Sequence, residues 1–130
     1  MDAKLRQFVR TRAGQRCEYC RVPQEFSELR FHIEHIIPRR HGGTDEANNL
    51  ALACPNCNFQ KGPNLTAIDP TGGEIVVLFN PRRDSWFDHF LYQDAHVMGL
   101  TPTGRATISL LDMNDPERRR IRELIAQIDR

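Results

Sequence analysis

The sequence lacks any apolar run that approaches the roughly 20 residues of a membrane-spanning helix. Its first residues, MDAKLRQFVR, also lack the apolar core of a secretory signal. Internal repeats and low-complexity tracts are missing as well. These absences predict a soluble cytoplasmic protein that has no membrane partner.

The chain has almost no excess of charge of either sign, because 18 Lys and Arg stand against 17 Asp and Glu. A formal net charge of +1 does not indicate a nucleic-acid partner in the way that a strongly basic chain does. Any such partner must therefore be recognised by local groups of residues. The length of 130 residues predicts one domain, residues 1–130, with a modest core.

Cysteine is scarce, and all four cysteines fall in two Cys-x-x-Cys pairs, Cys17 with Cys20 and Cys54 with Cys57. In a reducing compartment this pairing favours a metal site over disulfides. Four thiolates are the ligand set of a closed, tetrahedral structural zinc site. We therefore predict structural Zn²⁺; the alternative is a set of buried apolar thiols.

The pattern up to residue 62 predicts a small mixed unit. Apolar residues at helical spacing predict a helix over 2–13, and β-branched and aromatic residues predict a strand over 31–37. A Gly- and Asn-rich loop follows, and then a second strand over 50–53. Pro55 can open a short helix that ends near Gly62.

After Gly62 the pattern changes. A DPTGG turn between two apolar segments predicts a hairpin, and residues 85–111 have strand-like composition broken by Gly and Pro, with residues 86–92 open to either a helix or a strand. Asp115 and Pro116 then cap a final helix with an apolar stripe and with arginines on its exposed side. The fold class is therefore α+β, with a core finger at 17–62 and a β-rich C-terminal extension, 63–130, that ends in a helix.

Candidate chemistry gathers in FHIEHIIPRRHGGTDEANNLALACPNCNFQKG, residues 31–62. The Glu34 carboxylate and the Asn58 side-chain carbonyl offer the oxygen ligands that a hard cation such as Mg²⁺ prefers. His35 is suited to act as a general base near neutral pH, and Asn49 can hydrogen-bond its imidazole. These are the parts needed to cleave a phosphodiester.

Each of these residues also has a purely structural interpretation. Glu34 and His35 taken alone fit a solvated strand residue beside a structural histidine, and Asn49 fits a turn. Asn58 fits a polar position on the short helix. Adjacent residues of a regular strand point to opposite faces, so Glu34 and His35 reach one phosphate only if the strand twists, bends or ends there.

The same segment resembles the HNH endonuclease family in its zinc-knuckle form, in a His-Asn-Asn variant. The resemblance implies a ββα-metal finger in which His35 is the general base, Asn49 orients it, and Glu34 and Asn58 bind a catalytic Mg²⁺ or Mn²⁺. It also implies a structural zinc on Cys17, Cys20, Cys54 and Cys57. Two departures are Asn58 in place of the last His, a weaker transition-metal ligand, and Glu34 in place of the more usual Asp.

Arg39, Arg40 and Lys61 flank these residues and are predicted to contact nucleic-acid phosphates, with an ordinary solvated surface as the alternative. The resemblance implies DNA as the substrate, and the sequence leaves RNA open. Two rival functions are a non-catalytic zinc finger that binds nucleic acid or protein, and a structural domain of a larger phage or defence complex.

Overall fold

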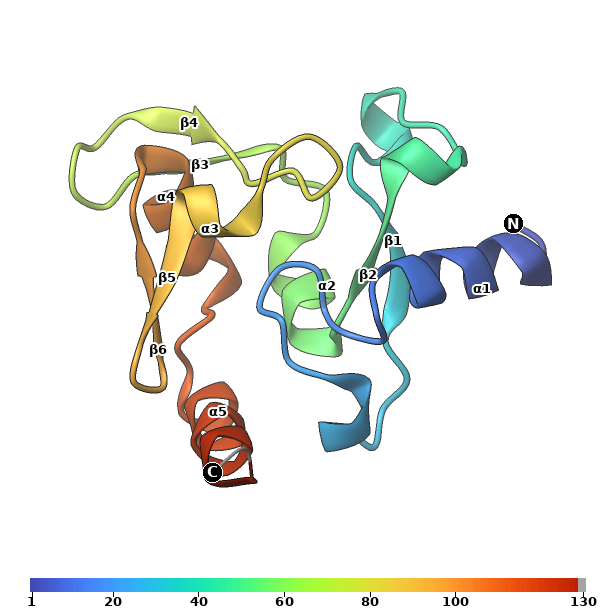
Figure 1. The fold of residues 1–130 in the computed structure, drawn as a ribbon. Helices are drawn as coiled ribbons and strands as arrows, with labels where there is room; N and C mark the ends of the chain where they lie inside the picture. The colour runs from blue at the N-terminus through green and yellow to red at the C-terminus, as the bar shows by residue number, and fades with distance from the viewer. Residues whose placement is uncertain (129–130) are drawn as a thin grey trace. The chain divides into compact units, whose positions relative to one another are not determined.

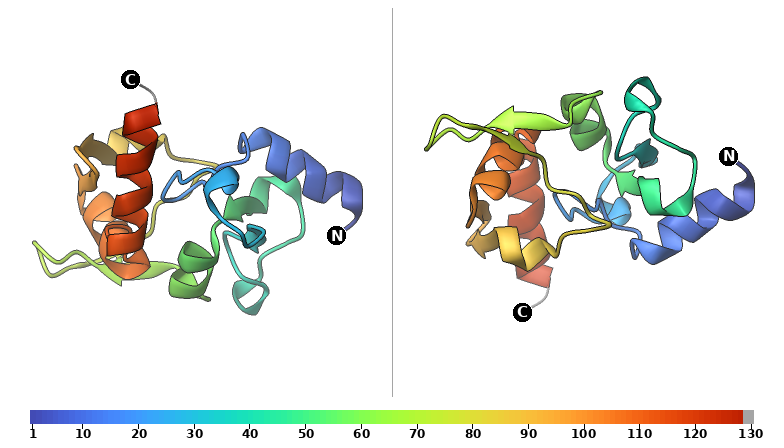
Figure 2. Two further views of the ribbon diagram at one scale, coloured as in Figure 1. Left: turned by 90° about the horizontal axis from the view of Figure 1, so that it is seen from below. Right: turned by 90° about the horizontal axis from the view of Figure 1, so that it is seen from above.

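The computed structural model describes residues 1–128, so the last two residues of the predicted 63–130 extension lie outside the described part. The chain divides into two units, Met1–Leu65 with Asn80–Arg83 and Thr66–Phe79 with Asp84–Arg130. Figure 1 labels the helices and strands of both units, and Figure 2 gives two further views. The two units are described separately below, and the single domain over 1–130 stays a prediction.

The first unit begins with helix α1 (Ala3–Arg12), close to the predicted 2–13. The Asp2 side chain accepts a hydrogen bond from the backbone N–H of Leu5 and so caps the helix. The helix ends where Gly14 takes a positive φ of 65°. Arg12, in the last turn, donates to the backbone carbonyls of Ala47 and Leu50 and thereby attaches α1 to the following strand pair.

Strands β1 (His32–His35) and β2 (Leu50–Ala53) pair antiparallel, with His32 opposite Ala53 and His35 opposite Leu50. All four residues of β2 are buried, as expected for the apolar sequence LALA. Helix α2 (Pro55–Lys61) follows directly, with Pro55 in its first turn. The predicted order of strand, loop, strand and short helix is therefore confirmed, although β1 is shorter than the predicted 31–37.

The loop between β1 and β2 is closely packed. Two short 3₁₀ turns, Arg39–His41 and Ala47–Asn49, shape it. A Cβ atom added at Gly43 would lie 1.6 Å from the carbonyl oxygen of Ile37, so only glycine fits there. The loop therefore has one well-defined path, which determines where its polar side chains lie.

The first cysteine pair lies on a loop that is fixed to β2. The backbone N–H of Glu18 donates to the carbonyl of Leu52, and the N–H of Leu52 donates to the Glu18 carboxylate. Arg82 forms an ion pair with the other oxygen of that carboxylate. A 3₁₀ turn, Gln24–Phe26, completes the loop. Glu18 thus connects the cysteine loop to Leu52 and to Arg82, which are far from it in the sequence.

The described residues of the second unit form two hairpins and three helices. The hairpins are β3 (Thr66–Ile68) with β4 (Ile75–Val77) and β5 (Phe90–Gln93) with β6 (His96–Gly99). The helices are α3 (Trp86–His89), α4 (Pro102–Leu111) and α5 (Pro116–Ile128). Helices and small antiparallel sheets together confirm the α+β class.

Helix α4 differs from the strand-like interpretation of residues 85–111. Thr101 caps it by accepting from the N–H of Gly104, and Pro102 occupies its first turn. These two start signals outweigh the β-branched residues in the segment. Asp112 then ends the helix in the left-handed conformation.

The buried face of helix α5 is rotated from the predicted apolar stripe of Ile121, Leu124, Ile125 and Ile128. Leu124 and Ile128 are 42% and 69% exposed and Ile121 and Ile125 are partly exposed, whereas Arg118 and Arg122 are buried. The guanidinium of Arg118 donates to the carbonyl of Leu111, and that of Arg122 donates to the carbonyl of Met113. These two arginines therefore donate hydrogen bonds to backbone carbonyls at and just after the end of α4.

Among residues 1–128, no helix has the length and apolar character that crossing a membrane requires.

Candidate active site and zinc site

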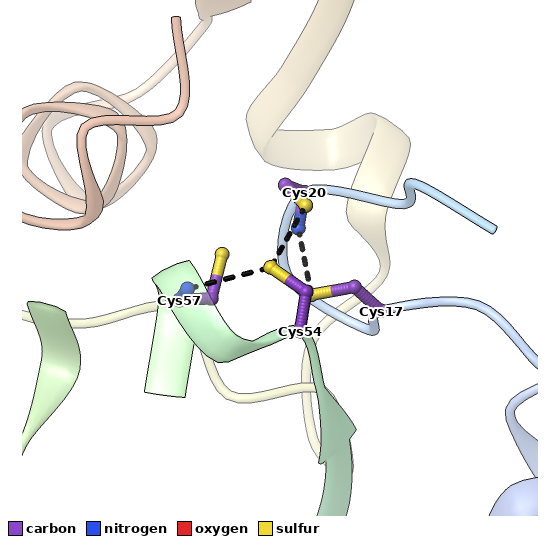
Figure 3. Close-up of side chains that lie close together, drawn as sticks. All are labelled: Cys17, Cys20, Cys54 and Cys57. Atoms are coloured by element: carbon purple, nitrogen blue, oxygen red, sulfur yellow. Dashed lines mark hydrogen bonds between the residues drawn. The ribbon is translucent and has the colours of Figure 1, made fainter. Parts of the chain in front are cut away.

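The four cysteines come together in the first unit, as Figure 3 shows. Cys17 and Cys20 lie on the loop after α1, Cys54 follows β2 and caps α2, and Cys57 lies in the first turn of α2. All four are buried and unbridged, and their sulfur atoms lie within 4.8 Å of one another. The doubled Cys-x-x-Cys pattern therefore forms one site.

The cluster fits zinc. Tetrahedral zinc with bonds of about 2.3 Å places sulfur atoms about 3.8 Å apart, and the Sγ atoms of Cys20 and Cys54 are 3.7 Å apart. The N–H of Cys20 donates to the Cys17 sulfur and that of Cys57 to the Cys54 sulfur, both at 3.4 Å. Without a metal, burial raises the pKa of the Cys17 and Cys57 thiols. Zinc would relieve this by binding the thiolates.

Glu34 points into the unit from β1 and is only 7% exposed. One carboxylate oxygen accepts a hydrogen bond from the hydroxyl of Tyr19, a residue between the first two cysteines. The other lies 3.3 Å from the Nζ atom of Lys61. Burial raises the pKa of Glu34, and Lys61 and Tyr19 oppose that rise. Glu34 thus connects the cysteine loop to α2.

Lys61 lies inside the unit, where its ammonium cannot present itself to a phosphate in solvent. It is 2% exposed, and its Nζ atom donates to the carbonyl of Ile36 at 2.9 Å as well as facing Glu34. The predicted role of Lys61 in nucleic-acid contact therefore does not fit its position. The reason is that the last turn of α2 faces β1.

His35 ends β1 and has partners different from those of Glu34. Its Nε2 atom lies 2.7 Å from an oxygen of Asp45, and its side chain is 20% exposed. Arg39 binds both oxygens of the same carboxylate, at 2.8 and 2.9 Å. Hydrogen bonds from His35 and Arg39 lower the pKa of Asp45 to about 2. The different partners of Glu34 and His35 follow from the alternation of side chains along a strand.

Asn49 holds the loop and does not contact the imidazole of His35. Its side-chain oxygen accepts from the N–H of Ile37 at 2.9 Å. Its amide hydrogens go to the carbonyls of Ile37 and Thr44, at 3.0 and 2.8 Å. Since both amide hydrogens are used by the backbone, Asn49 does not donate to His35 as predicted and instead holds the backbone of the loop.

Asn58 lies on α2 one turn before Lys61 and is partly exposed. Residues three apart share a helix face, so Asn58 lies on the side from which Lys61 reaches Glu34. Within residues 1–128, no hydrogen bond joins the side chains of Asn58 and Glu34.

The two loop arginines differ in their partners. Arg40 is exposed in the loop, whereas the guanidinium of Arg39 is held by Asp45. Asp45 is the residue of this group that the sequence pattern did not single out.

Charge is divided unequally between the two units. The first contains twelve Lys and Arg against seven Asp and Glu, a formal +5, and the second contains six against ten, a formal −4. The net charge of +1 for the whole chain therefore hides a basic unit and an acidic one. The residues that the sequence suggests for catalysis all lie in the basic unit.

Residues 17–64 match the family model described as HNH endonuclease. Neither the curated proteins nor the solved structures gave a significant match to the chain. An HNH domain indicates a nuclease or nucleic-acid-binding role, with a nucleic acid as the general class of partner, and the family also has non-catalytic members. The matched segment contains the whole cysteine cluster together with β1, β2 and α2. Residues 17–64 therefore form a domain of the HNH endonuclease family.

Proposed function

We propose that the chain is an endonuclease that hydrolyses DNA phosphodiester bonds at the end of β1. One observation supports this proposal: His35, which the resemblance implies as the general base, is partly exposed beside a carboxylate, inside the matched segment. A structural histidine in the core has no need of solvent access. A general base requires it, because its substrate is a water molecule next to the phosphate.

In the proposed reaction His35 accepts a proton from the attacking water through the ring nitrogen that Asp45 does not hold. Attack in line with the leaving group then yields 5′-phosphate and 3′-hydroxyl ends. A Mg²⁺ or Mn²⁺ ion on Glu34 and Asn58 would stabilise the negative charge on the phosphate and on the leaving 3′ oxygen. Asn49 acts by fixing the loop.

The proposal makes one demand on Glu34. Its two carboxylate oxygens face Tyr19 and Lys61, so the ammonium of Lys61 must move before Glu34 can offer that oxygen to another cation. Lys61 has a flexible four-carbon stem, and the movement also breaks its hydrogen bond to the carbonyl of Ile36. The metal-binding role of Glu34 and Asn58 is thus the part of the mechanism that depends most on rearrangement.

The formal +5 of the first unit supports a polyanionic substrate. Arg40 is exposed near His35 in sequence and is free to approach a phosphate. Arg39 would bind a phosphate only if its guanidinium first released the carboxylate of Asp45. We therefore assign the first phosphate contact to Arg40, and a secondary one to Arg39.

A non-catalytic nucleic-acid-binding module is the second candidate, and the engagement of Glu34 by Lys61 favours it. A finger that binds no catalytic metal has no need of an open carboxylate, so it would keep Glu34 in a buried ion pair with Lys61. The two candidates share the zinc site and the basic unit. They differ in whether bound DNA is cut.

Plasmid nicking tests the choice. Zinc-loaded protein is incubated with supercoiled DNA, with and without added Mg²⁺ or Mn²⁺, and the His35→Ala variant is compared with His41→Ala, which removes an exposed histidine from the same loop. We expect metal-dependent nicking by the wild type and by His41→Ala, and a loss of about 100-fold or more in His35→Ala. An RNA substrate in parallel determines the choice of nucleic acid.

Two outcomes would reject the proposal. Nicking by His35→Ala at the wild-type rate removes His35 from the chemistry. DNA binding without nicking by the wild type, over a range of metals and salt concentrations, favours the binding module. A matching loss in Glu34→Ala and Asn58→Ala, with zinc content unchanged, would support their role as metal ligands.

A further inference from the structure

The imidazole of His35 is held by a carboxylate from the opposite end of the loop. Asp45 lies ten positions after His35, yet its Oδ1 atom is 2.7 Å from the His35 Nε2 atom. The loop that joins β1 to β2 turns back to bring them together. Neither the zinc site nor the backbone contacts of the loop require this hydrogen bond.

The chemistry of the pair determines which ring nitrogen carries the proton. An ionised carboxylate can only accept hydrogen bonds, so a neutral imidazole beside it must donate from Nε2. The other ring nitrogen, Nδ1, then carries the lone pair. Among residues 1–128, His35 makes no hydrogen bond through Nδ1, so that lone pair is available to a water molecule.

Asp45 is itself fixed from both sides. The Nη2 atom of Arg39 donates to both of its oxygens, and the Nε atom of Arg39 donates to Oδ1 at 3.3 Å. The residue before it, Thr44, has its carbonyl held by the Asn49 side chain. The close contact of Gly43 with Ile37 restricts the loop further. The carboxylate therefore has a defined position before any substrate arrives.

We infer that Asp45 is a positioning residue, which holds His35 as the Nε2-protonated tautomer with Nδ1 directed at the attacking water, and that Arg39 supports Asp45 in this position. The inference rests on the proposed function only in taking His35 as the general base. It also gives the exposed Arg39 a supporting role in the loop besides the secondary phosphate contact proposed above.

The tautomer can be measured without activity. Heteronuclear NMR of the histidine ring nitrogens distinguishes a protonated from an unprotonated nitrogen, and a His35→Gln variant identifies the signals of His35 among those of the five histidines. At a pH where the ring is neutral, we expect the wild type to be protonated at Nε2. In Asp45→Asn both tautomers should appear, because an amide can either donate or accept.

Nicking kinetics provide the second readout. We expect Asp45→Asn to lower the nicking rate at saturating DNA by at least about tenfold, since a wrongly oriented base loses most of its contribution. Asp45→Glu, which keeps the acceptor, should recover most of the rate. Glu46→Gln removes an equal charge from the exposed neighbouring residue and should leave the rate unchanged. Arg39→Gln should give a smaller loss than Asp45→Asn.

The outcomes separate this inference from the proposed function. A wild-type His35 protonated at Nδ1 overturns the inference, whether or not the protein cuts DNA. Full nicking by Asp45→Asn with loss in His35→Ala also overturns it, while the nuclease proposal stands. An Nε2-protonated His35 in a protein that never nicks supports the geometry and rejects the nuclease.

Discussion

Replacing Lys61 by methionine should strongly destabilise the first unit. Methionine keeps a long apolar stem but removes the ammonium that faces Glu34 at 3.3 Å and the carbonyl of Ile36 at 2.9 Å. The Glu34 carboxylate is 7% exposed and would retain only the hydroxyl of Tyr19. Removing one partner of a buried ion pair typically costs about 3–5 kcal/mol, because the remaining charge has no compensation.

That free energy corresponds to a fall in melting temperature of roughly 12 °C or more for a unit of this size. The first unit can be followed selectively through zinc release on heating, since all four cysteines belong to it. Lys4→Met is the matched control, because Lys4 is exposed on α1. Its effect should stay within about 0.5 kcal/mol.

The pH dependence has a definite sign. Burial already raises the pKa of Glu34, and Lys61→Met removes the strongest opposing influence, so the pKa rises further. A carboxyl group whose pKa is higher in the folded state destabilises that state when it is ionised. The loss of stability in Lys61→Met should therefore be largest above the folded-state pKa and should shrink as the pH falls. Comparison with Lys4→Met at each pH cancels the protonation of the zinc ligands.

A double variant completes the test. Glu34→Gln with Lys61→Met removes both charges and should be more stable than Lys61→Met alone at alkaline pH. If Lys61→Met releases zinc at the wild-type temperature at pH 8, the pair is not an ionised, buried pair and the reasoning fails. The same holds if the loss of stability does not change with pH.

The remaining predictions concern the zinc site and the loop. Removing zinc with a chelator, or replacing Cys54 by serine, should lower the unfolding temperature, and metal analysis that finds no zinc in the wild type would contradict the site. Asn49→Ala should cost about 2–3 kcal/mol in chemical denaturation because three backbone partners lose their hydrogen bonds, whereas Asn48→Ala, at an exposed site, should be neutral. Gly43→Ala should cost more than about 4 kcal/mol or prevent folding, since its Cβ would overlap the carbonyl of Ile37, and an unchanged melting curve would refute the packing of this loop.

Local signals in the sequence were enough to predict the elements of the first unit. Apolar residues at helical spacing predict α1, Pro55 marks the start of α2, and LALA is apolar throughout, so each element follows from neighbouring residues. In the second unit local signals conflicted. Helix α4 contains β-branched residues that favour a strand, and the cap at Thr101 decided the outcome. Intrinsic β-propensity depends strongly on context, so it is a weak guide in such a segment.

Side-chain partners were harder to predict than elements. The spacing of the cysteines is sufficient to predict their cluster, because two Cys-x-x-Cys pairs have few other uses. The partner of His35 depends on the path of the loop, which sequence spacing does not determine, and Asp45 was therefore missed. Burial of Lys61 and Arg122 was missed for a related reason: long cationic side chains are expected in solvent unless a carboxylate or free carbonyl lies within reach.

The zinc site and the candidate active site share the cysteine loop and helix α2. The geometry around Glu34 in the candidate active site therefore depends on the stability of the zinc site. Tyr19 lies between two cysteines and donates to Glu34, so the cysteine loop positions that carboxylate. Helix α2 begins with the Cys54 cap and ends with Lys61, which donates to the carbonyls of His35, at the end of β1, and of Ile36, just after it. Loss of zinc would therefore release Glu34 from both sides, through the loop and through the helix. The Asp45 and His35 pair depends on the β1–β2 loop instead, so it should outlast the Glu34 contacts as zinc is withdrawn.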